Sequence, residues 1–271
     1  MDDGLFADWT RLLQHRAGLF IAPERRSFLV SGVRARMRES RCGNEREYYD
    51  RILSCGSEGH EWALLIDRLT VHETCFFRHQ SSMRLTAEQL MAEALANRGA
   101  CRIWSVGCAT GEEAYSLAML LDDAAQAAGD PADCRVVGAD ISRPSLQHAR
   151  EGVYLKRRLQ DIPTGFRSRY CSDISDSHFR IVDRLRERMS WFQWNLRDSD
   201  AAPMSDIDVL YCQNVLIYYD RQQRIEIVDR LTNCLRTGGV LVLGPGELLD
   251  WKHPNMEKVR YADTLAYRRT Q

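Results

Sequence analysis

The sequence predicts an α/β fold, in which helices cover both faces of a mostly parallel sheet, preceded by a smaller helical region. Three observations support this prediction. From about residue 69 onward, short apolar segments alternate with helical patterns. The first apolar segment, residues 101–106, leads through a glycine turn into a helix that begins at Glu112. Before about residue 65, apolar residues recur at helical spacing instead, as in Phe6, Trp9 and Leu13.

The individual elements follow from these local patterns. Near the N-terminus, one helix is expected around Phe6, and others at 23–39, 48–53 and 61–69. Strands are then expected near residues 101–106, 134–139, 190–195, 207–213, 239–244 and 264–269. Helices are expected near residues 80–97, 112–127, 143–150 and 221–236. Segments 178–182 and 189–194 are expected to pair as a small antiparallel excursion.

Composition narrows the functional class. Hydrophobic residues make up 44% of the 271 residues and the net charge is −1, which fits a globular protein and excludes a typical nucleic-acid binder. No apolar run is long enough for membrane insertion, and the start, MDDGLFADW, does not resemble a signal peptide, so a cytoplasmic location is expected. The nine cysteines include no C-x-x-C pair, so no metal site is expected.

The glycine turn and a downstream aspartate predict a nucleotide-type site. Residues 107–111 read G-C-A-T-G, and glycine permits the backbone angles and close ligand approach that such a turn needs. Asp140 ends the next predicted strand, 29 residues beyond Gly111. A carboxylate there can accept hydrogen bonds from both hydroxyls of a ribose. The alternative is that Asp140 caps the helix that follows it.

Four segments resemble the CheR family of chemotaxis-receptor methyltransferases, which use S-adenosylmethionine to methylate receptor glutamates. They read LTVHETCFFR, WSVGCATGEEAYSLA, GADISRPSLQHAREGVY and CQNVLIYYDRQQRIEIVDRLTNCLRTGGVLVLGPGE. The resemblance runs from about residue 10 to the C-terminus. It implies a helical N-terminal domain at 1–68 and a class I AdoMet-dependent (Rossmann-like) methyltransferase domain at 69–271. It also implies a small antiparallel β-subdomain at about 170–192 and a last strand inserted antiparallel.

The resemblance also implies a set of site residues. Those expected to bind the cofactor and its product S-adenosylhomocysteine are His72, Thr74, Arg78, Gly107, Glu113, Asp140, Asn195, Leu196, Gln213 and Asn214. Arg78 and Tyr218 are expected to be catalytic, with Tyr218 beside the methyl group. The residue types suit these tasks, since an amide fits the edge of adenine and an arginine fits a carboxylate. His72 and Gln213 depart from the asparagine and arginine usual in the family.

Structural roles remain open for several of these residues. Arg78 could pair with a surface acid, Asn195 and Asn214 could cap turns, and Tyr218 could be a core aromatic. No catalytic base is expected, because a glutamate acceptor with a pKa of about 4.3 is already ionised at neutral pH.

The N-terminal region predicts the partner. Residues 24–46 carry a net charge of +4, and Arg34, Arg38 and Arg41 share one helical face. By resemblance this face would dock the cytoplasmic helical region of a chemoreceptor, with the enzyme acting as a monomer; the alternative is a solvated helix. The connection CSDISDS, residues 171–177, lacks the glycine-rich insertion of relatives that bind a receptor tail pentapeptide, so independence of that peptide is expected. Competing functions are a small-molecule methyltransferase and a non-catalytic AdoMet-binding signalling module.

Overall fold

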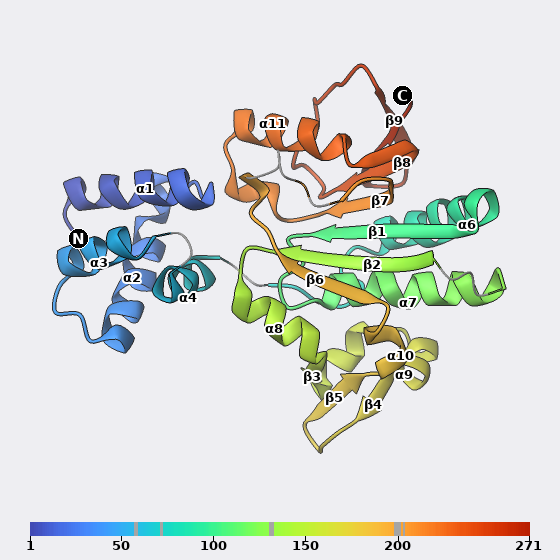
Figure 1. Cartoon of the computed structure of the whole chain (residues 1–271), viewed down its shortest axis with the longest axis horizontal. Coiled ribbons are helices and arrows are strands. Elements are labelled where there is room, and N and C mark those ends of the chain that lie inside the picture. Colours follow the sequence, from blue (N-terminus) through green and yellow to red (C-terminus); the bar gives the residue numbers. More distant parts are fainter. Residues whose placement is uncertain (57–58, 71–72, 130–132, 198–201, 203) are drawn as a thin grey trace.

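The computed structural model describes residues 1–56, 59–70, 73–129, 133–197, 202 and 204–271 (Figure 1). The chain begins with helices α1 (Asp3–Ala17), α2 (Arg26–Ser40), α3 (Glu45–Cys55) and α4 (His60–Leu69), with a 3₁₀ turn η1 (Pro23–Arg25) before α2. Asp2 caps α1 by accepting the N–H of Leu5 at 2.8 Å, and Gly18 ends that helix in the left-handed conformation. The helices enclose their own core around Trp9 and Leu29.

The main sheet has seven strands in the order β6-β2-β1-β7-β8-β10-β9. They are β1 (Ala100–Val106), β2 (Asp133–Asp140), β6 (Met189–Gln193), β7 (Ile207–Cys212), β8 (Leu235–Leu243), β9 (Met256–Tyr261) and β10 (Thr264–Arg269). β6, β2, β1, β7 and β8 run parallel, whereas β10 pairs antiparallel with β8, as the resemblance implies. The predicted fold class is confirmed, and β9 is a strand that the sequence did not predict.

Helices cover the two faces of this sheet (Figure 1). Ile103 and Trp104 point to opposite faces of β1 and belong to different cores. The Ile103 core includes α7 (Glu112–Ala127) and the continuous helical segment α5 (Gln80–Leu85), η2 (Thr86–Met91) and α6 (Ala92–Arg98). The Trp104 core includes α11 (Arg221–Thr232). The predicted helix at 221–236 is therefore too long, because Leu235 already begins β8.

A second, three-stranded sheet has the order β3-β5-β4, formed by β3 (Val153–Leu155), β4 (Cys171–Asp173) and β5 (His178–Ile181). The predicted pairing of 178–182 with 189–194 is wrong. Met189–Gln193 instead pairs with β2 in the main sheet, where Trp191 covers Gly138 so closely that a Cβ there would lie 2.4 Å from its ring. Short helical segments complete this region: α8 (Arg143–Glu151), η3 (Lys156–Asp161), α9 (Thr164–Tyr170) and α10 (Asp183–Arg186).

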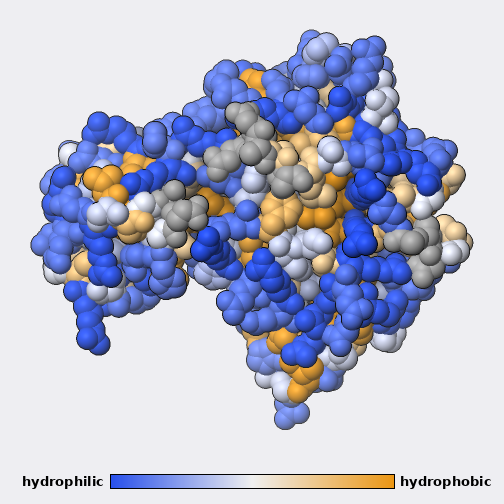
Figure 2. Space-filling model, viewed as in Figure 1, coloured by the Kyte–Doolittle hydropathy of each residue, from blue (hydrophilic) through white to orange (hydrophobic). Residues whose placement is uncertain are grey.

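The space-filling view shows a mostly hydrophilic surface over the N-terminal helices, and apolar side chains gathered toward the middle of the face (Figure 2). Within the described part of the chain, none of the helices combines the length and apolar character needed to span a membrane.

Candidate functional site

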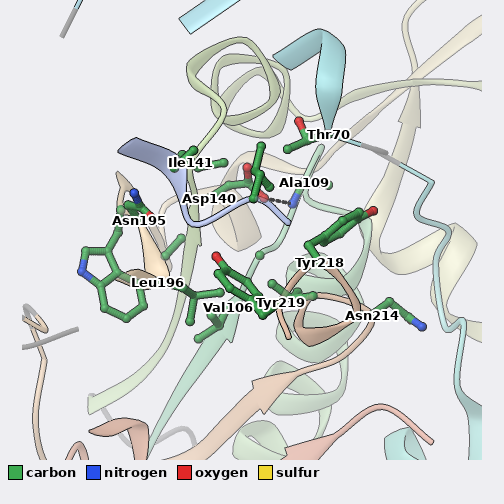
Figure 3. Close-up of a pocket in the computed structure, with 16 residues that line it drawn as sticks. Thr70, Val106, Ala109, Asp140, Ile141, Asn195, Leu196, Asn214, Tyr218 and Tyr219 are labelled. Carbon is green, nitrogen blue, oxygen red and sulfur yellow. Dashed lines mark hydrogen bonds between the residues drawn. The ribbon is translucent and has the colours of Figure 1, made fainter. Parts of the chain in front are cut away.

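A pocket lies at the carboxyl ends of β1, β2 and β7, the edge at which open α/β sheets bind ligands (Figure 3). About 610 Å³ of space not filled by atoms, open solvent included, lies within it. Six of the predicted site residues line it: Gly107, Asp140, Asn195, Leu196, Asn214 and Tyr218. The pocket therefore brings together residues that are more than 100 positions apart in the sequence.

The glycine turn forms one wall of the pocket. Gly107 has φ +69°, and a Cβ on it would lie 2.3 Å from Cγ2 of Val215. Its backbone N–H donates to the carbonyl of Ala139 at 2.8 Å, which ties the turn to the end of β2. Glycine is required at this position because it alone combines that conformation with the absence of a side chain.

Asp140 is held by the turn that it faces. Its Oδ2 accepts the backbone N–H of Ala109 at 2.8 Å (Figure 3). Its Oδ1 accepts the backbone N–H of Ser142 at 2.8 Å. The cap of α8 is Ser142, whose hydroxyl accepts the N–H of Ser145 at 3.1 Å. The alternative role of Asp140 as a helix cap is thus wrong. A carboxylate can accept several bonds, so Asp140 keeps the capacity to bind ribose hydroxyls.

The other lining residues connect to the N-terminal helices. Asn195 donates its Nδ2 hydrogen to the carbonyl of Arg16 at 3.2 Å and accepts the N–H of Arg197 at 3.1 Å. The carbonyl of Tyr218 accepts the N–H of Phe20 at 3.0 Å, and the Tyr218 side chain lines the pocket. Asn195 therefore already has a structural role as well as its predicted one.

Four predicted residues lie outside this lining, and His72 lies outside the described residues. Arg78 is exposed and donates to the carbonyl of Glu73 at 2.6 Å, while Thr74 is half-buried. Gln213 is buried and donates to the carbonyl of Leu243 at 3.0 Å, which is a core contact. Glu113 accepts a hydrogen bond from Ser105 Oγ at 2.7 Å.

Glu113 is nevertheless electrostatically distinctive. Burial raises its pKa to about 8, and the nearby charge of Glu247 acts in the same direction. The Ser105 hydrogen bond and the charge of Arg78 act in the opposite direction. An ammonium group bound beside Glu113 would favour the carboxylate, so the residues present fit the amino-acid end of the predicted cofactor.

This pKa shift predicts a pH-dependent stability. Because the folded-state pKa is raised from 4.5 to about 8, the neutral carboxyl is favoured in the fold, and stability from this group falls as the pH rises through that interval. The side chain in Glu113→Gln does not titrate. The urea concentration at the unfolding midpoint should therefore fall less in this variant than in the wild-type protein when the pH is raised from about 5 to about 9. Parallel midpoints in the two proteins would contradict the prediction.

Sequence reasoning missed one wall of the pocket. Ala17, Leu19 and Thr70 come from the N-terminal helical region. Their apolar or small side chains carry no chemical signal, and only the position of the N-terminal helical region beside the strand ends reveals them.

Comparisons with known proteins identify the family of this chain. The family described as "CheR methyltransferase, SAM binding domain" matches residues 72–265, and "CheR methyltransferase, all-alpha domain" matches residues 5–70. "Chemotaxis protein methyltransferase 2" of Pseudomonas aeruginosa is 30% identical over 87% of this chain and 83% of the relative. "Probable biofilm formation methyltransferase WspC" of the same organism is 32% identical over 96% of this chain and 61% of the relative.

Among solved structures, N-methyltransferase NodS from Bradyrhizobium japonicum, in complex with S-adenosyl-l-homocysteine, aligns with a TM-score of 0.39 at 15% identity. That alignment covers 69% of this chain and 87% of the other. The two family matches together span nearly all of the chain, including every residue that lines the pocket. The chain belongs to the CheR methyltransferase family and binds S-adenosylmethionine.

Proposed function

We propose that this protein transfers the methyl group of S-adenosylmethionine to glutamate side chains of chemoreceptors. The observation that supports this most directly is the construction of the pocket, which is completed by Ala17 and Leu19 from the region that also carries the basic helix α2. The N-terminal helical region would thus supply both the proposed surface for a macromolecular acceptor and part of the pocket wall. A relative with 83% coverage bears the name of a chemotaxis protein methyltransferase.

The proposed reaction depends more on the alignment of its two reactants than on general acid–base catalysis. A receptor glutamate, with a pKa of about 4.3, is ionised at neutral pH, and its carboxylate oxygen forms a bond to the methyl carbon as the bond from that carbon to sulfur breaks. The protein's contribution is to orient the two reactants and exclude water, which in model systems contributes up to roughly 7–11 kcal/mol. Tyr218, which lines the pocket, would orient the acceptor. Arg78, whose charge acts on Glu113, would hold the cofactor carboxylate.

The docking proposal concerns three arginines. Arg34 and Arg38 are exposed on α2, and Arg41 is exposed directly after it, with φ +57°. Arg34 bonds Glu45 at 2.8 Å, whereas Arg38 and Arg41 pair with no acid among the described residues. Arg36 is excluded from this surface because it is buried against Glu61. Free guanidinium groups on one side of a helix suit an acidic helical partner.

Replacing Arg34, Arg38 and Arg41 with alanine should slow methylation at low receptor concentration and leave S-adenosylhomocysteine affinity unchanged. The rate difference should shrink as salt is raised, because screening removes the attraction that the arginines supply. The control is a charge-matched triple variant of the exposed residues Arg135, Lys258 and Arg260 on β2 and β9. Equal slowing in both variants would show that net charge, and not this surface, matters.

The small sheet underlies a further prediction. Residues 174–177 make a short turn between β4 and β5, in which the N–H of Ile174 donates to the carbonyl of His178 at 3.2 Å. Docking a peptide at a sheet edge needs a long exposed edge and side-chain pockets, whereas β4 has three residues. Titrating a receptor tail pentapeptide should therefore give no saturable heat, and receptors without tails should remain substrates. Micromolar binding that is lost on altering residues 171–190 would contradict this.

Transfer of tritium from labelled S-adenosylmethionine to receptor-containing membranes tests the function. Base-labile radioactivity on the receptor band, absent when its acceptor glutamates are changed to alanine, would support glutamate methylation. Label in small molecules only would support the small-molecule methyltransferase. Cofactor binding without transfer to any acceptor would support the non-catalytic module.

A further inference from the structure

The loop that follows β7 is fixed by a buried carboxylate from the turn after β8. Glu247 is 4% exposed. Its Oε1 accepts the backbone N–H of Leu216 at 3.0 Å, and its Oε2 accepts that of Gly244 at 2.8 Å. The backbone amides of Asn214 and Ile217 also act to lower the pKa of this carboxylate. One side chain thus accepts an N–H group from each of two loops, and two further amides of the segment 214–217 act on it electrostatically.

Among the described residues, no cationic side chain forms an ion pair with Glu247. Backbone N–H groups therefore stabilise its carboxylate. Burial raises its pKa, and the four amides act against that shift. The fit is tight, because a Cβ at Gly244 would lie 2.5 Å from Oε2. Arg224 reinforces the junction by donating to the carbonyls of Tyr219, at 2.8 Å, and of Glu247, at 3.1 Å.

The clamped segment carries two residues that line the pocket. Asn214 has φ +61°, which is uncommon for a residue other than glycine and persists only where its surroundings hold it. Tyr218 closes the same loop, its N–H donating to the carbonyl of Val215 at 3.3 Å. We propose that Glu247 is a positioning residue for methyl transfer, which sets the places of Asn214 and Tyr218 by holding the backbone between them. The catalytic part of this inference rests on the proposed function.

Glu247→Gln tests the inference. The carboxamide replaces one acceptor oxygen with an NH₂ group, so that one of the backbone N–H groups loses its partner and the loop shifts. Affinity for S-adenosylhomocysteine should fall about tenfold by calorimetry, and kcat at saturating S-adenosylmethionine should fall by about the same factor.

Asp208→Asn is the matched control. Asp208 is also a buried carboxylate, lies near the other end of β7, and accepts the backbone N–H of Arg102 at 2.8 Å. The Asp208→Asn substitution should lower the melting temperature and leave ligand affinity and kcat at wild-type values. Wild-type affinity and kcat in Glu247→Gln, or equal losses in both variants, would overturn the proposal.

A second variant and a binding measurement cover the cases in which Glu247→Gln does not fold or the protein methylates no receptor. If Glu247→Gln does not fold, Gly244→Ala displaces the carboxylate without removing it and should give the same tenfold losses; wild-type affinity in Gly244→Ala would overturn the proposal. If the wild-type protein methylates no receptor, the proposed function fails, whereas the affinities of the variants for S-adenosylhomocysteine still decide the role of Glu247.

Discussion

Asp140→Ala is expected to weaken S-adenosylhomocysteine binding by about two orders of magnitude or more. In the proposed site, Asp140 accepts two charge-assisted hydrogen bonds from the ribose, each worth roughly 1.5–3 kcal/mol, and the variant would lose both. It would also leave the N–H groups of Ala109 and Ser142 without the acceptor that now orients the turn. Calorimetry with S-adenosylhomocysteine measures the loss directly.

The matched control for this experiment is Asp133→Ala. Asp133 begins the same strand, at the end remote from the pocket, and pairs with Arg102 at 2.5 Å. The Asp133→Ala substitution should leave ligand affinity unchanged. A folded Asp140→Ala protein with wild-type affinity would sink the assignment of Asp140 to the ribose.

Gly107→Ala is expected to abolish measurable ligand binding and to destabilise the fold by about 2–5 kcal/mol. A non-glycine residue at φ +69° costs roughly 1–2 kcal/mol, and forcing a methyl group against Val215 costs roughly 1–3 kcal/mol more. The displaced loop would also move Asn214 and Tyr218 within the pocket. Urea unfolding gives the first effect and calorimetry the second.

Gly99→Ala separates the two causes. Gly99 ends α6 with φ +62°, and an added Cβ would meet no atom within 4 Å. This variant should show only the conformational cost, with unchanged ligand affinity. If both glycine variants lose the same stability and both bind normally, the close approach of Gly107 to Val215 has no functional importance.

Local patterns were enough to predict the parallel strands and one strand-end residue. Asp140 could be placed because it ends an apolar run that reads as a strand, whereas the roles of Asn214 and Tyr218 came from the family resemblance. Parallel strands bring such ends to one edge, so adjacency in space follows from order in the sequence. Ser142 could not be identified as the cap of α8 in advance, because Asp140 and Ser142 are both good capping residues two positions apart.

Features that depend on distant packing were not predictable. Met189–Gln193 has a mixed pattern that fits either sheet, and the choice is made by Trp191 packing over Gly138. β9 escaped notice because Glu257, Lys258 and Arg260 are exposed and read as a loop. Gln213 follows a strand like the other site residues, yet its amide turns into the core. Spacing cannot say which way a side chain points.

The hydroxyl of Ser142 donates to the carboxylate of Asp67 on α4, while the N–H of the same serine donates to Asp140. One residue therefore bridges the helical region and the methyl-donor pocket. Where this bridge couples the two regions energetically, a partner that changes the α4–α8 contact changes cofactor affinity, and the cofactor changes partner affinity by the same factor. For protein engineering, exchanging the N-terminal helices between relatives is then expected to alter donor affinity together with partner choice, and measuring both affinities in such chimeras tests that expectation.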